Sequence, residues 1–314
     1  MKEKYIELCK NEKSIPVFMK NFWLDSVCDN WNVELYEKNN DIIAAFVYVV
    51  KNRYGIKYIS IPKSTQYNGL WIKSDNKLSE EKKTSLELEV MNYFLDKIEK
   101  LNMVFHIQTF SPKIKNLLPF YWRGYLIETK YTLVIENKNI DDIWNGINPK
   151  LRNIIKNASK KAVIFELDDA NLFYDFLIKT FERQNQLPRL TRSEFIKLDE
   201  ALKEKQIRYM IGAKDGEGQI HSICYFVCDN EKMYYLMSGT DANLRNCNFN
   251  SVILWEAIKK SNEMGLAFDF EGSMNKNIYS FMRKFGAELN PYYKVSKLYT
   301  KNQILKFIIN KKLN

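Results

Sequence analysis

The sequence lacks any long apolar run. Its longest, residues 42–50, has nine residues between Asp41 and Lys51, far short of the roughly 20 that a membrane-spanning helix needs. We therefore predict a buried strand there and no transmembrane segment. The first residues are mixed and polar, with neither an apolar signal core nor a small-residue cleavage site, so we expect a cytoplasmic protein.

Glycine and proline are also scarce, with 11 and 7 residues in a chain of 314. This excludes a fibrous repeat, and the 14% aromatic content argues against disorder. With 46% hydrophobic residues, the chain is long enough to fill the cores of two ordinary domains.

Histidine and cysteine are too few for the usual metal or disulfide frameworks. Two histidines leave a zinc site without enough ligands, and five cysteines form an odd set. Cys224 and Cys228 lie in an apolar run, on one face of an expected strand. We favour burial in the core over a metal site for both, and predict no metal.

Acidic residues are outnumbered, 38 against 48 basic ones, which gives a formal charge of +10. This balance favours anionic partners such as nucleotide phosphates, tRNA or an acidic membrane surface. The segment 304–312 is basic and amphipathic. It either contacts a membrane surface peripherally or packs on the body of the protein.

Hydrophobic spacing predicts two halves of similar plan. The first half has expected helices at 22–28 and from 79, and expected strands at 33–36, 42–50, 56–61 and 103–109. The second has expected helices at 149–161, 170–186, 192–205, 249–264 and 276–285, and expected strands at 163–167, 207–213, 219–228, 233–239, 266–271 and 292–297.

Three landmarks indicate a duplication. Ser111, Gly124 and Tyr131 have the same spacing as Ser273, Gly286 and Tyr293, and each set follows an expected long helix and strand. We expect one structural unit to occur twice.

The order of elements resembles the GNAT N-acyltransferase fold in tandem, as in the FemAB-like group of peptidoglycan-bridge aminoacyltransferases and related acetyltransferases. The resemblance lies in LPFYWRGY at 118–125, residues 144–161, FDFEGSM at 268–274 and FMRKFGAE at 281–288. It implies an α/β (α+β) protein whose two GNAT-like domains, 1–138 and 139–314, each have a mixed, mainly antiparallel sheet flanked by helices. The active site is expected in the second.

Two positions depart from the family's pattern. GNAT proteins that hold coenzyme A usually carry a glycine-rich motif before the central helix, and here the match runs from Arg245 through Asn248 to Asn250. Asparagine tolerates left-handed backbone, so Arg245 and Asn248 remain candidates for binding the phosphates of acyl-CoA. Where bridge-forming enzymes have Phe-Lys, this chain has Phe281 and Met282.

The resemblance also indicates where the reaction would occur. In a GNAT-type site the strand before the central helix supplies backbone N–H groups, which are those of Ser238 and Gly239 here. For a base we consider Asp269 and Glu271, two apart and so expected on one strand face. Glu271 is preferred, although either carboxylate could instead cap a helix or form an ion pair; Tyr293 is a candidate acid.

Further residues are candidates for substrate binding. Arg152 and Lys156 form a basic helical stripe that is either a solvated face or a phosphate contact, and Arg283 and Lys284 stand beside Met282. The segment 65–69, with Gln66 and Tyr67, resembles the acceptor cleft of FemAB-like proteins, although turn chemistry alone explains its Asn-Gly pair.

Three functions are compatible with these residues. The favoured hypothesis is an N-acyltransferase that moves an acyl group from acyl-CoA, for example acetyl-CoA, to an amine of a cell-envelope precursor, a small or nucleotide-linked molecule such as an amino sugar or peptide. The second uses aminoacyl-tRNA as donor. The third is a non-catalytic module that binds a glycan or nucleotide.

Overall fold

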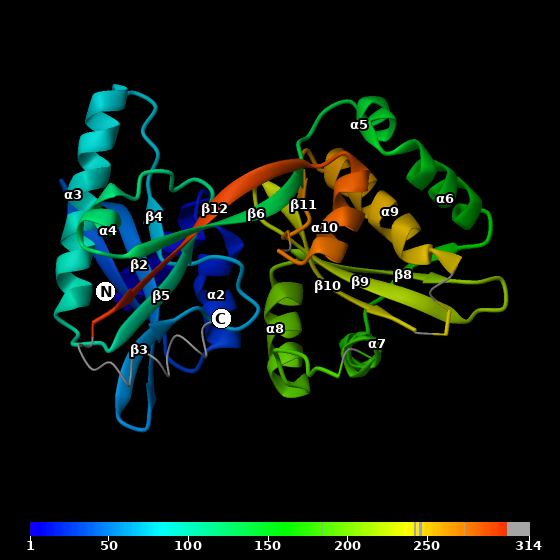
Figure 1. Cartoon of the computed structure of the whole chain (residues 1–314), viewed down its shortest axis with the longest axis horizontal. Coiled ribbons are helices and arrows are strands. Elements are labelled where there is room, and N and C mark those ends of the chain that lie inside the picture. Colours follow the sequence, from blue (N-terminus) through cyan, green and yellow to red (C-terminus); the bar gives the residue numbers. More distant parts are fainter. Residues whose placement is uncertain (184, 242, 245–246, 273, 300–314) are drawn as a thin grey trace. The chain divides into compact units, whose positions relative to one another are not determined.

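The computed structural model describes residues 1–183, 185–241, 243–244, 247–272 and 274–299. The described chain divides into two compact units (Figure 1): residues 1–130 with residues 291–299, and residues 131–290. This division differs from the expected boundary between 138 and 139. The last strand belongs with the first unit because it pairs there with a strand of residues 105–110.

The first unit forms a sheet with helices on both faces. It contains α1 (Lys2–Asn11), η1 (Val17–Met19), α2 (Asn21–Val27), β1 (Asn32–Lys38), β2 (Asp41–Arg53), β3 (Ile56–Ser60), β4 (Leu70–Ile72), α3 (Glu80–Glu99), β5 (Phe105–Phe110), α4 (Leu118–Trp122) and the first residues of β6 (Leu126–Ile135). The strand order is β1-β2-β3-β5-β12, where β12 is Glu288–Leu298, and β4 pairs with β2.

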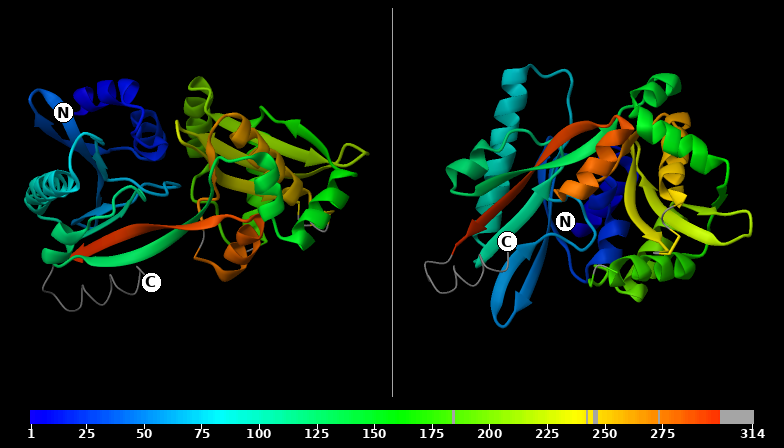
Figure 2. Two further views of the ribbon diagram at one scale, coloured as in Figure 1. Left: turned by 90° about the horizontal axis from the view of Figure 1, so that it is seen from above. Right: turned by 45° about the vertical axis from the view of Figure 1, so that its right-hand side comes forward.

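The apolar run in β2 is explained by burial on both faces. Alternate residues point to opposite sides of a strand. Phe46 and Tyr48 pack in a core with α3, whereas Val47 and Val49 pack in a second core with α1 and α2. Figures 1 and 2 show these helices on the two sides of the strands. The buried strand predicted at 42–50 is confirmed.

The second unit has the same layered plan. It contains the rest of β6, then α5 (Ile140–Gly146), α6 (Pro149–Ser159), β7 (Val163–Glu166), α7 (Ala170–Glu182), α8 (Arg192–Glu204), β8 (Arg208–Lys214), β9 (Ile220–Cys228), β10 (Lys232–Thr240), α9 (Phe249–Glu263), β11 (Ala267–Asp269), α10 (Lys276–Met282), η3 (Arg283–Phe285) and the start of β12. The strand order is β6-β11-β10-β9-β8-β7.

Strand β9 lies at the centre of this layering. Cys224, Phe226 and Cys228 pack in the core formed with α5, α6 and α9. Tyr225 points to the opposite face, where its ring packs on Phe173 of α7. The two cysteines are buried, so the prediction that they are core residues is confirmed.

The duplicated unit is visible in the element order. The series α3, β5, α4, β6 in the first half matches α9, β11, α10, β12 in the second. Gly124 and Gly286 both have left-handed backbone, with φ of +75° and +78°, where the helix turns into the last strand. A Cβ on Gly286 would lie 2.7 Å from the carbonyl oxygen of Gly146, so this position requires glycine. The landmark Ser273 lies outside the described residues.

Six elements of the described residues were not predicted from the sequence: α1, η1, β4, α4, β6 and α5. None of the helices in the described ranges has the length and apolar character to cross a bilayer. Within those ranges, no three His, Cys, Asp or Glu side chains are grouped as a metal site would require.

Candidate active site

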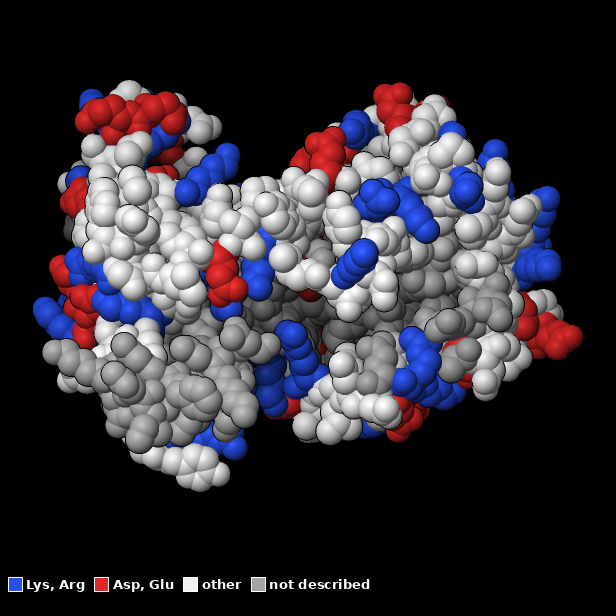
Figure 3. Space-filling view, in the orientation of Figure 1, with Lys and Arg blue, Asp and Glu red and all other residues white. Residues whose placement is uncertain are grey.

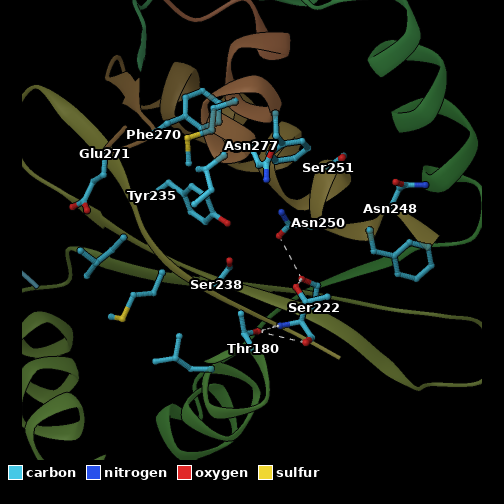
Figure 4. Close-up of a pocket in the computed structure, with 18 of the residues that line it drawn as sticks. Thr180, Ser222, Tyr235, Ser238, Asn248, Asn250, Ser251, Phe270, Glu271 and Asn277 are labelled. Carbon is cyan, nitrogen blue, oxygen red and sulfur yellow. Dashed lines mark hydrogen bonds between the residues drawn. The ribbon is translucent and has the colours of Figure 1, made fainter. Parts of the chain in front are cut away.

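A cavity of about 890 Å³ lies within the second unit (Figure 4). Its lining comes from α7, β9, β10, the start of α9, the segment after β11, and α10. The predicted residues Ser238, Asn248 and Glu271 all line it. In Figure 4, Glu271 and Asn248 lie at opposite ends, with Tyr235, Ser238 and Asn250 between them.

One edge of β10 is open beside this cavity. β11 pairs in parallel with only the first part of β10, Lys232–Tyr234, and then ends at Asp269. The register with β9 on the other side shifts between Tyr235 and Met237, which marks a β-bulge. Beyond Tyr234, β10 therefore extends past the last residue that β11 can pair with.

The hydrogen bonds of Thr240 show which backbone groups point to this open edge. The N–H of Thr240 donates to Thr180 Oγ1 at 2.9 Å, whereas the carbonyl of Gly239 accepts from Ser222 Oγ on β9 at 3.3 Å. Backbone groups alternate in direction along a strand. The N–H of Ser238 thus points to the same side as that of Thr240, away from β9, and that of Gly239 does not.

Gly239 instead fills a packing role. A Cβ at this position would lie 2.5 Å from the carbonyl carbon and the Cβ of Phe176 on α7. Only glycine allows α7 to approach the strand so closely. Of the two predicted backbone donors, the geometry favours Ser238.

A buried polar network forms one wall of the cavity. Asn250 Oδ1 accepts hydrogen bonds from Cys224 Sγ at 3.0 Å and Ser222 Oγ at 3.4 Å. The hydroxyls of Ser222 and Thr240 lie 2.8 Å apart. Burial raises the pKa of Tyr235, with Cys224 adding to the rise and Asn250 opposing it. The Tyr235 hydroxyl therefore stays protonated and is a hydrogen-bond donor at neutral pH.

Glu271 lies just after the end of β11, with a left-handed φ of +56° that is uncommon for a residue other than glycine. Its side chain is half-buried in the cavity lining. Burial raises the pKa of this carboxyl well above its usual value; the neighbouring Asp269 adds to the rise and Arg189 opposes it. A carboxyl with a raised pKa is suited to accept a proton near neutral pH.

Asp269 has a different environment. The prediction that it shares a strand face with Glu271 is wrong, because β11 ends at Asp269 and not at 271. Asp269 is fully buried. Its carboxylate lies 2.9 Å from Lys232 Nζ and accepts hydrogen bonds from Thr132 Oγ1 and, at 2.9 Å, from the N–H of Glu271. These contacts make Asp269 a structural residue that holds the backbone of Glu271.

The remaining candidates near the cavity separate into two groups. Asn248 is the N-cap of α9, with a φ of +59°, so left-handed asparagine backbone does occur at the start of the central helix. Met282 is buried and lines the cavity. Arg283 and Lys284 follow it on η3 with exposed side chains and are not among the lining residues. Arg245 lies outside the described residues.

The basic stripe on α6 lies away from the cavity lining. Arg152 donates to Asn145 Oδ1 at 3.2 Å, and Lys156 Nζ lies 5.8 Å from the centroid of the Trp144 ring. Figure 3 shows Lys and Arg side chains on the surface over α6, α9 and α10. The stripe is thus on a solvated face.

Three candidates belong to the first unit. Tyr67 is buried, with its ring edge-on to Phe18 at a centroid distance of 5.2 Å. The backbone carbonyl of Gln66 accepts from Thr109 Oγ1 at 3.0 Å. Tyr293 lies on β12, opposite a residue of β5, and packs against the core of that unit. None of these three is among the residues that line the cavity of the second unit.

The sequence analysis missed Tyr235, Ser222, Thr180 and His221 as lining residues. Ser222 is opposite Thr240 in the register of β9 and β10, and Thr180 reaches the same point from α7. No spacing along the chain signals these cross-strand and helix-to-strand meetings. Asn250 was considered only as part of a degenerate phosphate motif.

Comparison with known proteins shows a domain match in the second unit and a similar fold over the whole chain. Residues 150–279 match the family described as an acetyltransferase (GNAT) domain. A crystal structure of FemX covers 98% of both chains, with a TM-score of 0.70 and 14% identity. The structure of L-PGS from Bacillus licheniformis covers 98% of this chain and 96% of its own, with a TM-score of 0.58 and 9% identity.

A tandem GNAT protein from the clavulanic acid biosynthesis pathway is also similar, with a TM-score of 0.52, 7% identity and coverage of 87% and 84% of the two chains. No curated protein sequence matches the chain. These matches place a GNAT acetyltransferase domain in the second unit and support an acyltransferase. The expected tandem GNAT fold is confirmed.

Proposed function

We propose that the protein is an N-acyltransferase that moves an acyl group from acyl-CoA to an amine of a cell-envelope precursor in the cytoplasm, and that the reaction takes place in the cavity of the second unit. The observation that carries the proposal is a pairing of two groups in this cavity. Ser238 directs a backbone N–H to an open strand edge, and the half-buried Glu271 has a raised pKa.

Each group meets one requirement of acyl transfer. An amine attacks a carbonyl only when it is neutral, and Glu271 would accept the proton that the substrate ammonium loses. As the C–N bond forms, negative charge develops on the carbonyl oxygen, where the N–H of Ser238 would stabilise it. The C–S bond then breaks and the thiolate leaves; the nitrogen loses its extra proton to solvent and the thiolate gains one from solvent, which leaves an amide and a free thiol.

The far end of the cavity suits the donor. Asn248 begins α9, and the first N–H groups of a helix bind anions such as phosphate. The network of Ser222, Thr240 and Asn250 supplies neutral hydrogen-bonding groups along the way. An extended donor with a phosphate at one end and a carbonyl at the other would use both ends of this cavity.

A second candidate function uses aminoacyl-tRNA as donor. It is favoured by the likeness to FemX and to a putative lysylphosphatidylglycerol synthetase domain from Agrobacterium fabrum, which has a TM-score of 0.58 at 9% identity and covers 94% of this chain and 92% of its own. Arg152, Lys156, Arg283 and Lys284 would be phosphate contacts for this larger donor. The membrane contact suggested for 304–312 lies outside the described residues.

Isothermal titration with acetyl-CoA and longer acyl-CoAs, and filter binding of charged tRNA at low salt, would separate the two donors. We expect acyl-CoA binding, together with mass-spectrometric transfer of the acyl group to an amino sugar or peptide amine. Binding of tRNA alone would favour the second candidate. Failure of both donors to bind or react would refute acyl transfer at this site.

A further inference from the structure

A histidine that the proposed reaction does not use lies at the donor end of the cavity. His221 is in β9, only 3% exposed, and it lines the cavity. Its ring is stacked on that of Phe249, the first residue of α9, at a centroid distance of 4.4 Å and an interplanar angle of 26°. It therefore lies beside the helix end where the donor phosphate is expected.

The hydrogen bonds of Asp215 determine the tautomer of this ring. Asp215 Oδ2 lies 2.9 Å from His221 Nε2, and its Oδ1 accepts from the N–H groups of Glu217 and Gln219. The bond from His221 keeps the pKa of Asp215 below its usual value. An ionised carboxylate can only accept, so Nε2 carries the proton.

The other ring nitrogen, Nδ1, takes no part in the hydrogen bond to Asp215. Nδ1 of His221 is buried and has no hydrogen-bond partner in the described ranges. Buried polar atoms almost always have a partner, and one without it is destabilising until a water or ligand supplies one. Because His221 is a lining residue of the cavity, a ligand bound there would supply this partner.

We propose that His221, oriented by Asp215, binds a phosphate ester of the activated donor through Nδ1. This inference rests on the proposed acyl transfer and adds a specificity-determining residue to it. The same phosphate chemistry occurs in the diphosphate of coenzyme A and in the phosphodiesters at the 3′ end of tRNA. Asp215 is the positioning residue.

Donor binding then takes up a proton. With Nε2 already protonated, Nδ1 of the neutral ring is an acceptor and must gain a proton before it can donate to a phosphate oxygen. The charged groups around the ring are Asp215 at Nε2, Asp241, and Lys179 on α7, whose Nζ lies 3.3 Å from Asp241.

The test compares His221→Gln with wild type. A glutamine amide reaches the position of Nε2 and keeps the bond to Asp215, but it offers nothing at Nδ1. The probes are coenzyme A, pantetheine, which lacks the phosphates, and an RNA minihelix that ends in CCA. Titrations in two buffers of different ionisation enthalpy measure the protons taken up. Asp168→Asn, an exposed acid of the same unit outside the cavity lining, is the matched control.

We expect His221→Gln to weaken coenzyme A binding about tenfold, to leave pantetheine unchanged and to abolish the proton uptake. Weakening of the minihelix alone would assign the phosphate to tRNA and would replace acyl-CoA as donor. Equal affinity of wild type and a folded His221→Gln for both phosphate probes, or no binding of either by wild type, would overturn the proposal. Turnover with a Glu271 variant tests acyl transfer separately.

Discussion

Replacement of Glu271 by glutamine tests the proposed chemistry most directly. Glutamine keeps the volume of the side chain, so the cavity and the N–H of Ser238 remain in place, and only the proton acceptor is lost. Loss of a general base lowers the rate by about 10²- to 10⁴-fold. This corresponds to about 3–5 kcal/mol in the activation barrier.

The pH dependence adds a second signature. In wild type, only the ionised carboxylate of Glu271 accepts a proton, so kcat should rise with pH through the raised pKa of this group. This rising part of the pH profile, its ascending limb, should be absent in Glu271→Gln. Initial rates of acyl transfer from pH 5 to 9 would show it. The exposed Glu263, which is outside the cavity lining, provides a matched Glu263→Gln control that should retain both rate and limb.

The free energy of unfolding should fall over the same pH range in which kcat rises. Because the pKa of Glu271 is higher in the folded than in the unfolded chain, the folded state holds a proton that the unfolded state has lost above about pH 4.3. The free energy of unfolding therefore falls as pH rises from about 4.3 to the raised pKa of Glu271. Glu271→Gln has no titrating carboxyl at this position and should not show this decrease. Urea unfolding at pH 8 should show a variant at least as stable as wild type. Turnover within twofold of wild type, or a surviving pH limb, would refute the assignment.

Three further predictions concern the framework of the two units. Gly239→Ala places a Cβ 2.5 Å from the backbone of Phe176 and should destabilise the protein by about 1–3 kcal/mol, seen as a lower Tm in a thermal scan; an unchanged Tm would contradict this packing. Asp269→Ala leaves the largely buried ammonium of Lys232 without its carboxylate and should cost about 3–5 kcal/mol in urea unfolding, partly recovered by adding Lys232→Met; no recovery would count against the ion pair as the cause. Burial lowers the pKa of His106 to about 4, so the unfolded state takes up a proton that the folded state refuses, and about 3 kcal/mol of stability should be lost between pH 7.5 and 4. The free energy of unfolding, measured by fluorescence and plotted against pH, should differ in slope between wild type and His106→Gln over this range, and parallel plots would refute the lowered pKa of His106.

Local patterns were sufficient for much of the fold. The run at 42–50 is apolar at every position because β2 is buried on both faces, and this signal needs no knowledge of the partners. The repeated landmarks anticipated two matching units, since Gly124 and Gly286 occupy equivalent left-handed turns. Glu271 was identified because a carboxylate in an otherwise apolar segment requires a polar environment.

Other features depend on residues that are far apart in the chain. The exchange of β12 into the first unit depends on its pairing with β5, and so the boundary expected at 138 and 139 differs from the observed division. Tyr67 was a candidate for substrate binding because segment 65–69 resembles an acceptor cleft, but its side chain is buried and its ring packs against Phe18. The two acidic residues near β11 separated into a structural and a candidate catalytic role because the strand ends at Asp269.

The sequence by itself thus determined most of the segments that form strands and helices, that the plan is repeated, and which carboxylate to test, because these follow from spacing and burial along one segment. Only the tertiary structure decided that Ser238 has the outward N–H, that Gly239 is a packing residue, and that His221 belongs to the cavity. Each of these depends on register across strands or on a helix crossing a sheet, and contacts of this kind produce no periodic pattern in the sequence.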